Sequence, residues 1–342
     1  MPHAIRELSG HVAMDYLTSQ WRDLYHQDSE ATPYQSPQWL AGWAEQLPYT
    51  ATPVVLVAQA PTGRTLAALA LAREDQGGTG AARMYPLSAP IAEYVRPIGP
   101  HAEDSAIAGS FAFYLTLLAA EGERVEMTDV PTTSSLGHYL AQTCADGAWG
   151  HGTTECAEIR LPLDFQSMPR SSKRDHQRRQ RTWSRLADGH RVVYHRTRHT
   201  KELLVAYGVL ADLHERQRAS EALLPGSTFA AGSVQWRAVL ERCASTAFIA
   251  TLAVDGVAIA AQLCLVRGRD AFAVVPAVDP GHRHLAPGHA LLRHLAVDLA
   301  SEGFQTLDLG RTAPGQHAYK AQYRPRWNTT VSAVSTPQAS AA

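Results

Sequence analysis

The sequence has few cysteines and no long apolar run. It holds four cysteines in 342 residues, far apart in the chain and in no Cys-x-x-Cys pair. This spacing favours neither a disulfide framework nor a zinc site. No stretch approaches the roughly 18 apolar residues of a membrane-spanning helix, and the first residues lack the apolar run of a signal peptide. We therefore expect a cytoplasmic protein without a membrane span.

Several short catalytic motifs are also missing. The sequence contains no Gly-x-Ser-x-Gly, no Gly-x-x-x-x-Gly-Lys-Ser/Thr and no His-Glu-x-x-His. These absences remove the usual signatures of covalent serine catalysis, of a phosphate-binding loop and of zinc hydrolysis. No cysteine lies in a recognisable catalytic context. The chemistry that remains is a direct reaction without metal and without a covalent enzyme intermediate.

The composition is that of an ordinary globular protein. Hydrophobic residues make up 45% of the chain and charged residues 18%, which is enough apolar material for a sizeable core. The length is sufficient for two domains.

Positive charge is concentrated in one segment. Residues 170–198 hold ten Lys or Arg but only two acids, Asp175 and Asp188, whereas the net charge of the whole chain is −1. The remaining residues therefore carry a net charge of −9. Such asymmetry points to a local contact with a polyanion, and the alternative is a solvated linker helix.

Periodicity predicts a similar order of elements in both halves. In the first half, Ser36 and Pro37 suit the start of a helix. Strands are expected at 52–60, 65–73 and 124–130, and helices at 105–121 and 134–147. In the second half, strands are expected at 190–196, 247–254, 257–267, 270–278 and 306–310, and helices at 169–186, 201–220, 233–244 and 288–303.

These patterns predict an α+β protein of two related domains. We expect an N-terminal domain over 1–165, a basic connecting helix over 166–190, a C-terminal domain over 191–335 and a disordered tail over 336–342. An antiparallel meander followed by one helix and one further strand is the layout of GNAT-type acyltransferases. The mixed, mainly antiparallel sheet of each domain should therefore be flanked by helices.

Six features in order near the C-terminus resemble the CelD/BcsL-like acetyltransferases, a group related to the GCN5 acetyltransferases. They are Asp279-Pro280, Arg283, Pro287-Gly288, Gly303 with the strand acid Asp308, Gly310-Arg311, and Tyr319-Lys320. The basic segment and the stretch that begins "YQSPQWLAGW" also resemble this family, so that the resemblance covers most of the chain.

The resemblance implies two tandem acyl-CoA N-acyltransferase folds. It implies transfer of an acyl group, with acetyl-CoA as the leading donor, to an amine of a small molecule or of a cell-envelope or natural-product precursor. Fem-like aminoacyl-tRNA transferases share this architecture, so an amide-forming enzyme that uses tRNA is the alternative. A non-enzymatic nucleic-acid-binding module is a weaker alternative.

The segment "RHLAPGHA" is the predicted donor site. A helix N-terminus presents free N–H groups and a positive dipole end, which favour an anion. Arg283, Ala286, Pro287, Gly288 and His289 are its candidate residues. The segment departs from the usual acetyltransferase phosphate loop because it has a single loop glycine, and ordinary helix capping is the alternative interpretation.

Helical spacing places four arginines of the basic segment on one face: Arg174, Arg178, Arg181 and Arg185. We take Arg178 and Arg181 as candidate donor contacts. Such a stripe suits the 3′-phosphate of CoA, a tRNA backbone or an acidic substrate. A single tryptophan, Trp183, does not provide the interleaved aromatics of single-strand binding proteins.

The candidate catalytic residues lie mostly near the C-terminus. Asp308 ends a strand whose neighbours Leu307 and Leu309 should face the opposite side, and a buried carboxylate needs a partner. Arg311 and Lys320 are the expected partners, either in a structural ion pair or at the reaction site. There Lys320 would stabilise an oxyanion or a phosphate, and Tyr319 would protonate the leaving group.

Two further residues are candidates for accepting the proton of the amine. His214 lies late on a long predicted helix, and histidine has a suitable pKa. Glu93 lies in the loop "SAPIAEYV", which the family resemblance places at the cleft. Either of them is also readily explained as an ordinary surface or structural residue.

Overall fold

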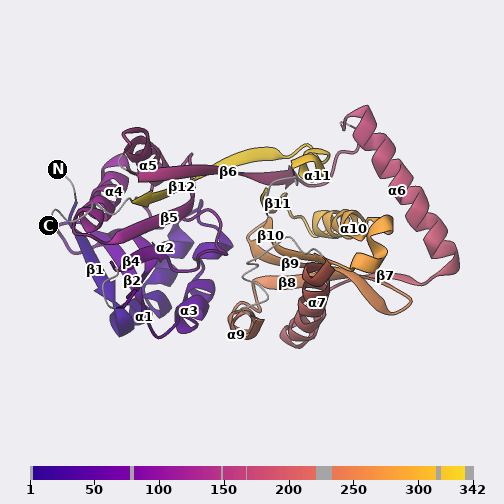
Figure 1. The fold of residues 1–342 in the computed structure, drawn as a ribbon, viewed down its shortest axis with the longest axis horizontal. Coiled ribbons are helices and arrows are strands. Elements are labelled where there is room, and N and C mark those ends of the chain that lie inside the picture. The colour runs from indigo at the N-terminus through magenta and orange to yellow at the C-terminus, as the bar shows by residue number, and fades with distance from the viewer. Residues whose placement is uncertain are drawn as a thin grey trace. The chain divides into compact units, whose positions relative to one another are not determined.

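The computed structural model describes residues 3–77, 81–147, 149–166, 168–220, 233–312 and 317–335. The chain divides into two compact units, each built from strands and helices (Figure 1). Unit 1 comprises Met1–Glu155 and Asn328–Ala342, and unit 2 comprises Cys156–Trp327. The predicted α+β class is confirmed.

Unit 1 begins with one strand and a group of helices. Its elements are β1 (Ile5–Ser9), α1 (Gly10–Thr18), α2 (Trp21–Gln27), the 3-10 turn η1 (Pro33–Gln35), α3 (Pro37–Glu45), β2 (Ala51–Gln59), β3 (Thr65–Glu74), β4 (Arg83–Pro86), α4 (Ser105–Ala120), β5 (Arg124–Pro131) and α5 (Ser135–Ala145). The start of α3 is the one predicted from sequence: the Ser36 hydroxyl accepts a hydrogen bond from Trp39 N at 3.3 Å.

The sheet of unit 1 is antiparallel except at one pair of strands. Strands β1 to β5 are neighbours in chain order. The β4–β5 pair is parallel and extends over two rows only, Arg83 beside Arg124 and Met84 beside Val125. Helix α4 crosses between these two strands.

Unit 2 repeats this order after a long basic helix. It holds the end of β6 (Trp149–Arg160), then α6 (Arg170–Gly189), β7 (Val192–Arg196), α7 (Thr200–Ser220), α9 (Ser233–Arg242), β8 (Ala247–Val254), β9 (Val257–Arg267), β10 (Asp270–Val278), the 3-10 turn η2 (Pro280–Leu285), α10 (Pro287–Ser301), β11 (Thr306–Arg311), α11 (His317–Ala321) and the start of β12 (Arg326–Ser335).

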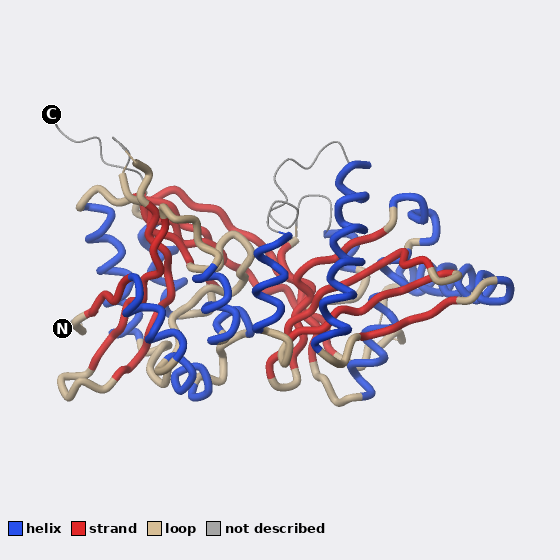
Figure 2. The backbone as a smooth tube through the Cα atoms, turned by 90° about the horizontal axis from the view of Figure 1, so that it is seen from below, coloured by secondary structure: helices blue, strands red, loops and turns tan. Residues whose placement is uncertain are grey.

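Helices cover both faces of the unit 2 sheet, whose strand order is β6-β11-β10-β9-β8-β7. Alternate residues of a strand face opposite sides. Phe248, Ala250 and Leu252 of β8 share one core cluster with the leucines of α10, whereas Ile249 is buried on the other side, where α7 contacts β8, β9 and β10. Figure 2 shows the strands of the sheet with the surrounding helices.

The last strand of each half joins the other unit. Strand β6 follows α5 in sequence, but its residues 156–160 pair with β11. Strand β12 follows α11, but residues 330–334 pair with β5. The units therefore divide at other residues than the predicted boundaries at 165, 190 and 335, and the basic helix lies within unit 2. The predicted tail over 336–342 lies outside the described residues.

All four cysteines are buried, and none of them forms a disulfide. Within the described ranges, no helix is both long and apolar enough to cross a bilayer.

Candidate active site

Two parallel strands of unit 2 separate part-way along their length. Strands β10 and β11 pair through three rows only, of which the last joins Phe272 to Asp308. Strand β10 then continues to Val278 through a bulge at Val274, between Ala273 and Val275. Bulges bend a strand and increase its twist, and they occur frequently beside active sites. Past Asp308, the edges of β10 and β11 no longer hydrogen-bond to each other, and this opening is the candidate cleft.

Helix α10 begins in the loop that leaves β10, and its first turn has a free donor. The N-cap position is Ala286, which has no side-chain acceptor and a left-handed backbone (φ 51°). Gly288 N has no hydrogen-bond partner in the described part of the chain. A Cβ atom at Gly288 would lie 3.4 Å from Cγ1 of Val278, an ordinary contact. This helix end is therefore open to an anion.

The loop before α10 is fixed by the last turn of α7. Gln217 Oε1 accepts a hydrogen bond from Val278 N at 3.0 Å, and Arg216 Nη1 pairs with Asp279 Oδ1 at 3.2 Å. Burial raises the pKa of Asp279, but bonds from His282, Gly281 N and Arg216 outweigh it, so the pKa lies below its usual value. The exposed Arg283 contacts Ser220 Oγ at 3.4 Å. The loop is thus anchored around an ionised Asp279.

Lys320 reaches back from α11 to the separated end of β11. Its side chain is buried, and Nζ donates to the backbone carbonyls of Leu309, Gly310 and Arg311 at 2.8, 2.7 and 2.6 Å. Three carbonyls satisfy the three donors of an ammonium group. Lys320 therefore contacts Arg311, but at the backbone carbonyl of that residue. This contact anchors α11 to β11.

Asp308 holds the turn at the end of β11. It is buried, and its Oδ1 accepts a hydrogen bond from Gly310 N at 2.5 Å; Gly310 has a left-handed φ of 68°. Leu307 packs in the core on the α10 side, so the predicted opposite orientation of Asp308 is confirmed.

A second carboxylate, Glu158, lies beside Asp308. The two residues are register partners on β6 and β11 and share one face of the sheet. Burial raises the pKa of Glu158, and the charge of Asp270 adds to this rise, while Arg326 and Arg160 oppose it. A half-buried carboxyl group with a raised pKa at the opening of two strands is a candidate general base. The sequence interpretation missed it.

Tyr319 of α11 and His289 of α10 lie against each other. Their ring centroids are 4.5 Å apart. Burial raises the pKa of Tyr319 to about 12, so its hydroxyl is protonated at neutral pH and can donate. His289 Nδ1 lies 2.6 Å from the hydroxyl of Tyr323. Burial, together with Arg179 and His176, lowers the pKa of His289 to about 3, and this imidazole is neutral.

The basic helix α6 turns its predicted arginine stripe outward. The side chain of Arg178 is 76% exposed and pairs with Asp175 at 3.1 Å, and Arg181 is exposed. The inward face instead carries His176, Arg179 and Trp183. Arg179 Nη1 donates to Gln322 Oε1 at 2.7 Å, and Trp183 Nε1 donates to Leu285 O at 2.9 Å. The donor-binding role of Arg178 and Arg181 stays a prediction.

The two candidate bases from the sequence belong to other elements than this group. His214 is half-buried on α7, three residues before Gln217, which holds the end of β10. Glu93 is buried in unit 1, next to Tyr94, whose backbone is left-handed (φ 58°). Their catalytic roles stay predictions.

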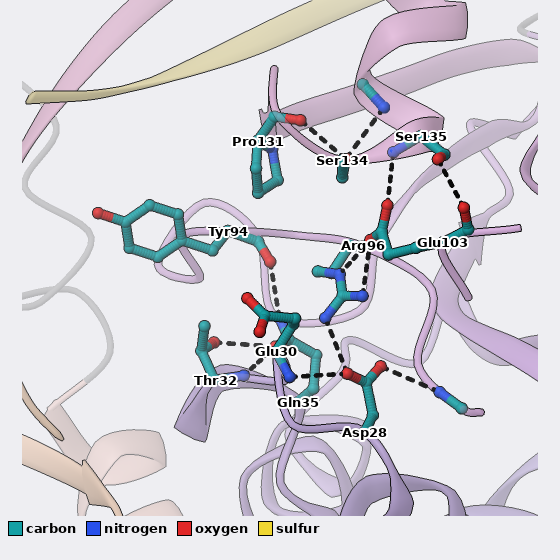
Figure 3. Close-up of polar contacts among 12 residues, drawn as sticks. Asp28, Glu30, Thr32, Gln35, Tyr94, Arg96, Glu103, Pro131, Ser134 and Ser135 are labelled. Atoms are coloured by element: carbon teal, nitrogen blue, oxygen red, sulfur yellow. Dashed lines mark hydrogen bonds and ion pairs between the residues drawn. The ribbon is translucent and has the colours of Figure 1, made fainter. Parts of the chain in front are cut away.

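The loop that contains Glu93 is fixed by a buried polar network (Figure 3). Arg96 lies between Asp28 at 3.1 Å and Glu103 at 2.6 Å, and Gln35 Nε2 donates to Tyr94 O at 2.9 Å. The left-handed backbone of Tyr94 is held in place by these contacts.

A segment in the second half of the chain matches a known protein family. Residues 171–321 match the family described as acetyltransferase (GNAT) domain. No curated protein matches the chain.

Solved structures with low sequence identity share the fold over nearly the whole chain. FemX has 10% identity and a TM-score of 0.61, with 96% of each chain covered. The C-terminal domain of a putative lysylphosphatidylglycerol synthetase from Agrobacterium fabrum has 13% identity and a TM-score of 0.58, covering 94% of this chain and 93% of that one. A tandem GNAT protein from the clavulanic acid biosynthesis pathway has 16% identity and a TM-score of 0.53, covering 98% and 100%.

These likenesses confirm the GNAT-type fold predicted from the order of elements, and the family match supports an enzyme rather than the non-enzymatic alternative. The matched family covers α6 to α11, which are the elements that build the cleft and the α10 N-terminus. The chain is an acyltransferase with a GNAT-type fold, and the residues that match the acetyltransferase (GNAT) domain lie in its second half.

Proposed function

We propose that the protein is a cytoplasmic, CelD/BcsL-like N-acyltransferase that moves an acyl group from acyl-CoA to an amine of a small molecule. One observation carries this proposal: β10 and β11 separate after Asp308, and β10 leads through η2 into the open N-terminus of α10. A thioester donor needs both an extended channel for its arm and an anion site for its phosphates, and the opening after Asp308 and the start of α10 support these two roles.

The residues at the start of α10 fit a pyrophosphate. Gly288 N is a donor without a partner in the described ranges, and no side chain caps this helix. The dipole end of a helix attracts negative charge, and the nearby exposed Arg283 adds a positive charge. His289, neutral and half-buried, would line the same end of the helix.

The reaction then needs one base and one acid. The amine nitrogen attacks the thioester carbonyl carbon, a C–N bond forms and the C–S bond breaks. Glu158, with its raised pKa, would take the proton that the nitrogen loses. Tyr319, with a pKa raised to about 12, would give its proton to the leaving thiolate. Lys320 would keep the separated end of β11 in position through its three carbonyl contacts.

An aminoacyl-tRNA donor is the second candidate. It is supported by the exposed arginines on the outer face of α6, Arg174, Arg178, Arg181 and Arg185. The fold likeness to FemX agrees with the Fem-like alternative expected from the sequence. A row of exposed arginines suits a nucleic-acid backbone better than the few phosphates of one CoA molecule.

Calorimetry with acetyl-CoA on three forms of the protein tests the donor. Gly288→Ala adds only a Cβ with an ordinary contact to Val278, so this variant should fold and bind nearly as the wild type does. Gly288→Glu places a carboxylate at the same helix end and should abolish binding. Equal affinity of Gly288→Glu and the wild type would exclude α10 as the donor site.

The same titrations with charged tRNA separate the two donors. For a tRNA enzyme, a triple variant should bind tRNA more weakly and with a shallower salt dependence; its substitutions are Arg174→Glu, Arg178→Glu and Arg181→Glu. The reason is that a protein with fewer phosphate contacts displaces fewer counterions when it binds. For an acyl-CoA enzyme, the wild type should bind acetyl-CoA and not tRNA. The triple variant should then retain its acetyl-CoA affinity within a few-fold.

A further inference from the structure

A second cavity lies in unit 2, between the inner face of α6 and the outer face of α10. Its volume is about 500 Å³, and it is lined from α6, from Val192 of β7 and from α10. Pockets of 300–1,000 Å³ are the usual size for drug-sized ligands. Figure 1 shows α6 running past α10 in this unit.

This cavity is separate from the cleft between β10 and β11. Helix α10 turns Leu291, Leu292, Leu295 and Leu299 toward the sheet, where they are buried in the core. The cavity instead meets His289, Ala290, Arg293, His294 and Val297, on the opposite face of the same helix. A body of packed leucines therefore stands between the two sites.

The cavity carries uncompensated positive charge. Arg179 and Arg293 both line it, whereas no Asp or Glu is among its lining residues. Within the described ranges, neither arginine forms an ion pair with a carboxylate. Arg293 lies over the ring of Phe165 at 5.3 Å, and Arg179 contacts the neutral groups Gln322 and His289. Two partly buried guanidinium groups without an acid favour an anionic ligand.

A buried histidine of the same cavity has an unused hydrogen-bonding atom. His176 is 8% exposed, and its ring lies between Phe165 and Tyr323, at centroid distances of 5.4 and 5.2 Å. Its Nε2 atom has no hydrogen-bond partner in the part of the chain that the structure describes. Burial, with Arg179 and Arg293, lowers the pKa of His176. A buried polar atom without a partner is costly, and a bound ligand would remove this cost.

The rest of the wall is apolar. Trp183, Ala187, Val192, Ala290 and Val297 line the cavity, and the indole N–H of Trp183 is already bonded to Leu285 O. The aromatic face of Trp183 is therefore available for an apolar group. A sugar or a polyphosphate would find few polar partners here, since only Gln180 and Ser184 supply neutral polar groups beside the histidines.

We propose that the cavity between α6 and α10 binds a small organic acid, with its carboxylate at Arg179, Arg293 and His176 and its apolar body against Trp183 and Val297. Apart from His289 at the start of α10, its lining shares no residue with those placed at the acyl-transfer cleft. The ligand class is an aliphatic or aromatic monocarboxylate.

The site can be tested with two probes, 3-phenylpropionate and octanoate, and their uncharged amides. Binding to the full-length protein is measured by calorimetry and by the change in tryptophan fluorescence. At least one of the acids should bind, and its amide should bind at least tenfold more weakly, because the amide lacks the charge that the arginines recognise. Neither acetyl-CoA nor inorganic phosphate should displace the acid.

Three variants assign the binding to this cavity. Arg293→Gln should lower the affinity for the acid by about tenfold or more. Arg237→Gln, the same change at an exposed position on α9 that pairs with Glu241, should have no effect. Val297→Trp is at a position that is 60% exposed, so it should leave folding intact while filling the cavity and blocking binding.

Each contrary result overturns the proposal. The proposal is wrong if neither acid binds at millimolar concentration, or if acid and amide bind equally well. It is also wrong if folded Arg293→Gln and Val297→Trp keep the affinity of the wild type, or if acetyl-CoA displaces the acid. The last result would make the cavity part of the donor site.

Discussion

Replacing Lys320 by Met decides whether this residue is mainly an anchor or mainly a catalytic group. Met has nearly the same length but no charge and no donor. In the wild type, Nζ donates to three backbone carbonyls at 2.6–2.8 Å, and the side chain is 4% exposed. The substitution leaves these carbonyls at the separated end of β11 without their donor.

The expected loss of stability follows from those three contacts. Leaving one buried acceptor unsatisfied costs about 1–3 kcal/mol. Removing a buried ammonium group also relieves a desolvation cost, which offsets part of the loss. We expect a net destabilisation of about 3 kcal/mol. For a unit of this size, that corresponds to a fall in Tm of roughly 6–12 °C.

Differential scanning calorimetry measures this change, with Lys201→Met at an exposed position on α7 as the matched control. The control should shift Tm by less than about 2 °C, because surface substitutions rarely change stability by more than about 0.5 kcal/mol. A Lys320→Met protein with the Tm of the wild type and a kcat lowered by about 10²-fold or more would refute the anchoring argument. It would support the oxyanion role expected from the sequence.

Three further predictions concern pH, a glycine and a buried ion pair. In the folded protein the pKa of His289 is about 3, below the usual 6.5. Between these two pH values the unfolded chain binds more protons than the folded one. The unfolding free energy should therefore fall as pH drops from about 6.5 toward 3. Denaturant titrations should show a smaller fall in His289→Gln, with exposed His151→Gln as control; equal curves would contradict the buried neutral imidazole. Gly137→Ala should lower the Tm of unit 1 by several degrees or more, since the new Cβ would lie 2.0 Å from Pro131 O. The control is Gly208→Ala on α7, whose Cβ would meet nothing within 4 Å. This control should stabilise the protein by up to about 1 kcal/mol. A soluble Gly137→Ala protein with an unchanged Tm would show that the backbone at Pro131 can move away without a loss of stability. Arg96→Met should destabilise by about 3–5 kcal/mol in chemical denaturation, because Asp28 is left buried without its cation; a loss below about 1 kcal/mol would mean that water reaches Asp28.

The amino-acid sequence by itself determined the local elements of this protein. Ser36 caps the start of α3 with its side chain, and Pro37 occupies the first helical position. Asp255-Gly256 forms the turn between β8 and β9, and both residues have the positive φ that such two-residue hairpin turns need, 50° and 82°. The order of elements was sufficient to predict the GNAT-type fold, because hydrophobic periodicity and turn chemistry are properties of neighbouring residues.

Only the tertiary structure decided which distant segments meet. The pairing of β6 with β11 and of β12 with β5 joins residues far apart in the sequence, and no local pattern specifies a partner strand. Likewise, α6 carries arginines around most of its circumference, so that its sequence does not show which face turns inward. Packing against Phe165, Leu285 and Tyr323 buried the face with His176, Arg179 and Trp183 and left Arg178 and Arg181 in solvent.

The site shows the same division between local and distant information. The strand end and the family resemblance made Asp308, Tyr319 and Lys320 candidates, but the carbonyl partners of Lys320 were visible only in the structure. Glu158 was missed because its place beside Asp308 exists only through the register of β6. Its raised pKa likewise results from burial and from Asp270, and neither can be read from residues adjacent to Glu158 in the chain.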